Sequence, residues 1–147
     1  MRCVQFVFAA VAALLSSAVV CAEPETRRYL YMSMPDAAQT EGRSGNAILV
    51  FDIDNGHKFV RRIPMPVFEE GLRGFTGSAS TGCVYYSTTN RRLGCFDLVK
   101  EQTVWEQTYD AGCDRSSITL DGKKIYVPTG LWYGGADCGF LVVNAAC

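Results

Sequence analysis

SSITLDGKKIYVPTG, residues 116–130, is the stretch that decides the fold. Residues 117–120 form a short β-prone run, Asp121-Gly122 is a turn dipeptide, and residues 124–129 alternate around Tyr126. An Asp-Gly pair between two such runs favours a β-hairpin, because both positions tolerate the positive φ of a tight hairpin turn. The stretch therefore predicts two antiparallel strands joined by a tight turn.

A repeat of this pattern runs through the chain. Its first marker, an apolar residue followed by Tyr, stands at residues 30–31, 84–85 and 125–126. Its second, an apolar residue followed by Asp or Asn, stands at 51–52, 96–97 and 143–144. The last two copies are about 41 to 47 residues apart, the size of one propeller blade. Short strands at this spacing predict an all-β sandwich or a β-propeller, and the repeat favours propeller blades made of four-stranded antiparallel meanders.

The repeat divides the chain into about three blades. Blade one spans residues 28–66, blade two spans 71–110, and an incomplete blade three spans 112–147. The first lacks its inner strand A and the last lacks its outer strand D, whereas closed propellers typically have four to eight complete blades. We therefore expect an open arc, an N-terminal fragment of a longer protein or a truncated product. Its exposed blade edges would offer a route to self-association.

The first 22 residues predict a secretory signal peptide cut after Ala22. Met1-Arg2 supplies positive charge, residues 6–20 are apolar, and charge returns after Ala22. The apolar run is short for a membrane span of about 20 residues, and Val20 disfavours a lipoprotein anchor on Cys21. The mature chain, residues 23–147, is therefore expected in the periplasm or outside the cell, away from membranes. The net charge of the full sequence, -1, argues against nucleic-acid binding.

Five of the seven cysteines follow the signal segment. Exported thiols tend to pair, and an odd number leaves at least one unpaired within the chain. The first predicted disulfide joins Cys113 to Cys138 across a long loop, and the second joins Cys83 to Cys95 across one hairpin. The chain has no C-x-x-C motif and one His, so we predict neither a metal site nor a cofactor.

Two stretches carry a family resemblance. Residues 116–130 resemble the hairpin of strands A and B in YVTN-type, quinoprotein amine dehydrogenase-like β-propellers, which are seven-bladed and built from WD-like repeats. AILVFDIDNGHKFVRRIPMP, residues 47–66, resembles the next half-blade of that family. The resemblance covers nearly all of the mature chain. It implies a chain that is incomplete relative to seven blades, and it implies little about activity, because this fold hosts many functions.

The resemblance also indicates a ligand-binding face, formed by the B-to-C and D-to-A loops. Two B-to-C loops are long, residues 35–45 and 130–137, and the second carries Trp132 and Tyr133. Long loops with aromatic residues are binding candidates, and the alternative is packing of both rings against a neighbouring loop.

Arg73 and Arg115 lie at the starts of two A strands, the innermost strands of a blade. Two guanidinium groups near the channel mouth would suit an anionic or carboxylate ligand. The alternative is that both arginines pair with neighbouring acidic residues, namely Asp114, Glu69 and Glu70.

The remaining polar candidates predict structural roles. Asp52 and Asp97 each end a strand beside a turn, where a carboxylate usually accepts hydrogen bonds from turn amides. His57 follows Gly56 in a turn and is expected to be solvated, so it supports no Ser-His-Asp arrangement.

The sequence therefore favours an exported propeller segment that acts as a scaffold for an unknown ligand or protein and is not catalytic by itself. The alternative left open is a fragment or subunit of a periplasmic propeller enzyme. Such an enzyme would resemble either the heavy chain of a quinoprotein amine dehydrogenase or a lactonase.

Overall fold

The computed structural model describes residues 26–34, 46–66, 71–130 and 139–146. The predicted signal peptide, the long loop at 35–45, Trp132, Tyr133 and Cys138 lie outside these residues, so their assignments stay predictions.

Three antiparallel sheets make up the described part of the chain, and it contains no helix. The first sheet has the order β1-β2-β3, with strands at Tyr29–Met34, Ala47–Asp52 and Lys58–Pro64. The second has the order β4-β5-β6-β7, with strands at Leu72–Ser78, Cys83–Thr88, Arg92–Asp97 and Gln102–Thr108. The third has the order β10-β9-β8, with strands at Gly139–Asn144, Lys124–Thr129 and Ser117–Ile118. The predicted all-β class is confirmed.

The hairpin at residues 116–130 forms with a shorter first strand than predicted. Gly122 has a φ of 70°, and its amide donates to the Thr119 carbonyl at 2.9 Å. Lys123 N donates to Asp121 Oδ1 at 3.0 Å. Because the turn begins at Thr119, strand β8 keeps two residues where the alternation predicted four.

The turn carboxylates play the structural role that the sequence predicts. Asp97 Oδ1 accepts hydrogen bonds from the amides of Lys100 at 2.9 Å and Val99 at 2.8 Å. These two bonds hold the pKa of Asp97 below its usual value. Asp52 Oδ1 accepts from Asp54 N at 3.0 Å in the same way. His57 is exposed in its turn, as expected.

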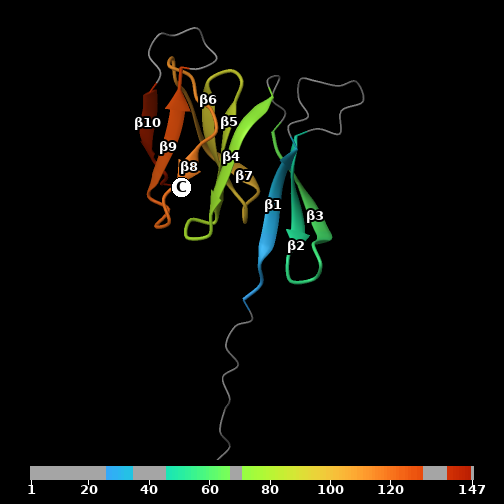
Figure 1. Cartoon of the computed structure of the whole chain (residues 1–147). Helices are drawn as coiled ribbons and strands as arrows, with labels where there is room; N and C mark the ends of the chain where they lie inside the picture. The colour runs from blue at the N-terminus through green and yellow to red at the C-terminus, as the bar shows by residue number, and fades with distance from the viewer. Residues whose placement is uncertain (1–25, 35–45, 67–70, 131–138, 147) are drawn as a thin grey trace, which may run out of the picture.

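The second sheet lies between the other two (Figure 1). All six residues of β5 are buried, and they alternate between the two faces of the sheet. Val84 and Tyr86 pack toward the first sheet, in a core with Ile48, Val50 and Ile63. The opposite face packs on the third sheet in a second core, with buried members Cys83, Tyr85, Leu93, Cys95, Cys113, Ile125, Val127 and Ala145. Sheets stacked face to face in this way are propeller blades, and with three, four and three strands they form a partial propeller.

Both predicted disulfides are wrong. Cys83 and Cys113 are free thiols buried in the second core. In the strand register Cys83 faces Asp97 while Cys95 faces Tyr85, so the two cysteines of the hairpin are diagonal neighbours, too far apart for a disulfide. Burial raises the pKa of Cys113 to about 11, which keeps it as a thiol at neutral pH. Cys95 is disulfide-bonded, but to neither Cys83 nor Cys113.

Candidate functional site

The strand directions define two ends of the structure. Strands β1 and β9 end, and β4 begins, at the same end of the structure (top of Figure 1). Both sequence-predicted arginines lie at this end. We call the group formed by Arg73, Ser87, Asp114 and Arg115 the arginine end.

Arg73 belongs to a β-bulge. The register of β4 against β5 shifts between Leu72 and Gly74, so Arg73 is the extra residue. A bulge redirects the side chain of its extra residue, and here the Arg73 Nε donates to Asp114 Oδ1 at 3.1 Å. Both side chains are about four-fifths buried, with exposures of 22% and 21%. For Arg73, the alternative of pairing with Asp114 is the one that the structure adopts.

The backbone at Asp114 connects the second sheet to the third. Ser87 Oγ donates to the Asp114 carbonyl at 2.9 Å, and the Asp114 amide donates to the Pro128 carbonyl at 3.0 Å. Asp114 is therefore held by β5 on one side and by β9 on the other. This clamp fixes the backbone from which the next residue, Arg115, projects.

Gly74 brings the two predicted arginines together. A Cβ at this position would lie 2.7 Å from the Arg115 Cα and 2.7 Å from Ser87 Oγ. The missing side chain thus allows β4 to touch the backbone of Arg115. The Arg115 side chain itself is exposed and has no ion-pair partner among the described residues. The site therefore has two different guanidinium groups. That of Arg73 is paired with a carboxylate, and that of Arg115 faces solvent from a backbone that is held in place.

The sequence did not reveal a second polar group at this end. Tyr86, fully buried, donates to Glu106 Oε1 at 2.7 Å, and Arg92 Nη1 lies 3.4 Å from Glu106 Oε2. Burial first, and then the Glu106 contact, raise the pKa of Tyr86. Tyr86, Gly94 and Glu106 form one cross-strand row, and a Cβ on Gly94 would overlap the tyrosine ring. This polar group can be recognised only when the strand register is known, and the repeat length alone does not provide the register.

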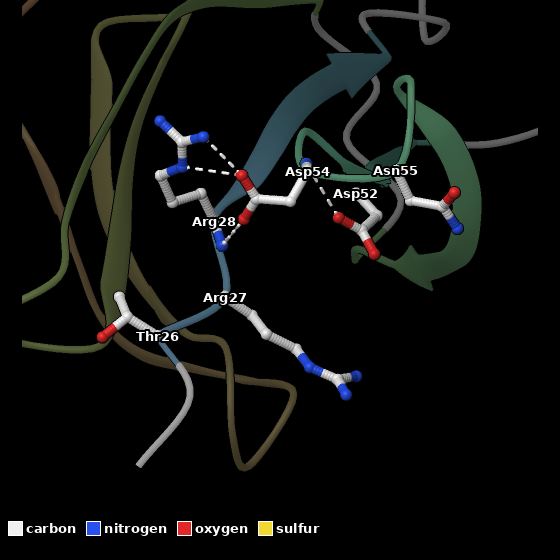
Figure 2. A pocket seen from close by; sticks show the side chains of 6 residues that line it. All are labelled: Thr26, Arg27, Arg28, Asp52, Asp54 and Asn55. Atoms are coloured by element: carbon white, nitrogen blue, oxygen red, sulfur yellow. Dashed lines mark hydrogen bonds and ion pairs between the residues drawn. The ribbon is translucent and has the colours of Figure 1, made fainter. Parts of the chain in front are cut away.

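The opposite end carries a polar cleft where the first sheet begins (Figure 2). The Arg28 amide donates to Asp54 Oδ2 at 3.0 Å, and its Nε donates to Oδ1 at 2.8 Å. The bond from the Arg28 side chain is the main cause that lowers the pKa of Asp54. Arg28 and Asp54 satisfy each other's hydrogen-bonding groups. This pair therefore holds the segment before β1 against the turn after β2.

The described residues contain no group of three or more His, Cys, Asp or Glu side chains suited to a metal ion. The chain's one histidine, His57, lies in the turn before β3, at the opposite end from the arginines. Within the described ranges, no helix is long and apolar enough to cross a membrane.

Comparisons with known proteins support the fold. No protein-family model matches the sequence, and no curated protein matches it. Among solved structures, dihydro-heme d1 dehydrogenase NirN in complex with DHE matches 80% of this chain with a TM-score of 0.50 and 16% identity. The β-propeller domain of Myceliophteria thermophila Cps50 (Swd1) matches 78% with a TM-score of 0.46 and 8% identity. The chain spans 22% and 35% of these two proteins. The structural neighbours are β-propeller proteins, and this chain has the fold of part of a β-propeller.

Proposed function

We propose that this chain is a segment of an exported, YVTN-type propeller that acts as a binding scaffold, and that the arginine end binds an anionic ligand or an acidic segment of a protein partner. The observation that carries the proposal is the exposed side chain of Arg115 on a backbone fixed by Gly74 and by the Asp114 clamp. A guanidinium presents several N–H donors in a planar fork that matches a carboxylate. Because the backbone is already ordered, little further ordering accompanies binding.

The two arginines have different roles in this proposal. Arg73 is paired with Asp114 and so positions the segment that carries Arg115, whereas Arg115 contacts the ligand. Export is supported by the apolar N-terminal segment, and the net charge of -1 supports a partner other than nucleic acid. The enzyme alternative stays a prediction, because a shared fold carries no chemistry by itself.

Arg115→Gln is expected to weaken binding of a hexaglutamate peptide about tenfold, since a hydrogen bond to a charged group contributes roughly 1.5–3 kcal/mol. Isothermal titration calorimetry on the purified protein measures the affinity. Lys58→Gln is the matched control, because Lys58 is an exposed cation at the opposite end and should leave the affinity unchanged. Equal losses in both variants, or no binding by the unmodified protein, would contradict the proposal.

A further inference from the structure

A cleft opens between the first and second sheets, where β1 begins and β4 ends. This is the end opposite the arginine end. The cleft has a volume of ≈ 750 Å³, and sites for small molecules typically measure roughly 300–1,000 Å³. We call it the inter-sheet cleft and define it by Tyr29, Tyr31, Phe75, Gly77, Val84 and Val99.

The walls of the cleft are the facing sides of two sheets. Tyr29 and Tyr31 lie on the side of β1 that packs against the first core. On the other wall, Phe75 packs against the same core, and Gly77 lies opposite the buried Val84 in the register of β4 and β5. Gly77 adds no side chain to this wall. The cleft therefore lies inside the stack of sheets, between two walls that the structure describes.

The repeat shows how this cleft differs from the equivalent place between the second and third sheets. Tyr31 and Tyr85 hold the same position of the first repeat marker. The Tyr85 hydroxyl donates to the Ala145 carbonyl at 2.6 Å, and the repeat counterpart of Ala145 is Leu98. The hydroxyls of Tyr31 and Tyr29 have no hydrogen-bond partner among the described residues. Two phenol groups therefore line the cleft with their hydrogen-bonding capacity unused.

The charge of the lining favours an anion. Arg27 and Arg28 are the charged side chains among the described residues that line the cleft, and no carboxylate lines it. Arg28 contacts Asp54 through Nε and Nη2, and its Nη1 lies outside that contact. Aromatic walls accept a flat apolar body, whereas phenol and guanidinium groups donate hydrogen bonds to a carboxylate.

We propose that the inter-sheet cleft binds a small aromatic carboxylate. Its ring packs between Tyr31 and Phe75, and its carboxylate accepts hydrogen bonds from the tyrosine hydroxyls on the side of Arg28. Burial of the ring supplies affinity, and the charge complementarity selects an anion over a neutral molecule of the same shape.

The probe is 2-naphthoate, titrated into the purified protein and followed by isothermal titration calorimetry. Saturable binding of one molecule per chain is expected. The matched ligand 2-naphthamide has the same ring without the charge and should bind about tenfold more weakly, since charge-assisted hydrogen bonds are roughly twice as strong as neutral ones. Excess hexaglutamate should not displace naphthoate, because the arginine end lies at the opposite end of the sheets. Displacement would place naphthoate at Arg115 and overturn this proposal alone.

Val99 offers a matched pair of variants at the mouth of the cleft. It is a turn residue with an exposure of 86%, so its replacement should not disturb folding. Val99→Glu should weaken naphthoate binding about fivefold by charge repulsion and leave naphthamide binding unchanged. Val99→Gln has the same shape without the charge and should change neither affinity.

The double variant Tyr29→Phe, Tyr31→Phe keeps both rings and removes both hydroxyls. It should weaken naphthoate binding at least tenfold, whereas Tyr126→Phe on the exposed side of the third sheet should not change it. Absent naphthoate binding, equal affinity for naphthamide, or equal effects of Val99→Glu and Val99→Gln would overturn the proposal. Undiminished binding by the double variant would overturn it as well.

Discussion

Replacing Tyr85 by alanine is expected to lower the free energy of unfolding by about 3–5 kcal/mol, the range for removing a buried aromatic ring. Tyr85 is completely buried in the core between the second and third sheets. Its ring lies 6.2 Å from that of Trp105, and its hydroxyl donates to the Ala145 carbonyl at 2.6 Å. The change removes both the packing between the sheets and the bond that secures the residues after β10.

Urea denaturation followed by circular dichroism measures this loss. Tyr85→Phe is the control, because it keeps the ring and removes only the hydroxyl, at a cost of roughly 0.5–1.5 kcal/mol. Since domains of this kind are stable by only about 5–15 kcal/mol, the alanine variant should unfold at a much lower urea concentration. A loss no larger than that of the phenylalanine variant would mean that the second and third sheets do not pack as described.

Gly74→Ala is expected to destabilise the protein by about 1–3 kcal/mol, the usual cost of overpacking a filled site. The new methyl group would lie 2.7 Å from the Arg115 Cα, which is a backbone atom, and 2.7 Å from Ser87 Oγ. The backbone must therefore move, and the clamp at Asp114 opens. We also expect weaker binding of hexaglutamate, because Arg115 loses its fixed position.

Gly71→Ala is the matched control for this substitution. Gly71 lies one residue before β4, and a Cβ there would meet no atom within 4 Å. It should leave both the unfolding free energy and the hexaglutamate affinity nearly unchanged. Similar effects of the two substitutions would show that the close contact between β4 and Arg115 is absent in solution.

The repeat predicted the sheets well because apolar alternation and turn residues are local properties of the sequence. The Asp-Gly turn forms where the pattern predicts it. The tyrosines of the repeat's first marker and the turn carboxylates also lie at the predicted positions. Contacts between side chains of different strands were harder to predict, because they depend on register and on side-chain direction. The pairing of Cys83 with Cys95 failed for this reason: a diagonal pair and a directly opposed pair look alike until the register is known.

The candidate site illustrates the same limit. The sequence placed Arg73 and Arg115 at one end of the blades, and it named Asp114 as an alternative partner. The bulge that makes Arg73 the extra residue, and so directs it to Asp114, is a backbone irregularity without a clear sequence signal. The buried pair of Tyr86 and Glu106 likewise depends on a three-strand row.

The second sheet is covered on both faces, whereas β10 pairs only with β9 among the described residues. Residue-resolved native-state hydrogen exchange tests this arrangement most directly. Strand β5 pairs with β4 and β6, so we expect all of its amides to exchange only on global unfolding. Strand β10 pairs with β9 alone, so alternate amides at 139–144 should exchange orders of magnitude faster. Uniformly slow exchange along β10, or exchange in β5 as fast as at that edge, would contradict the account.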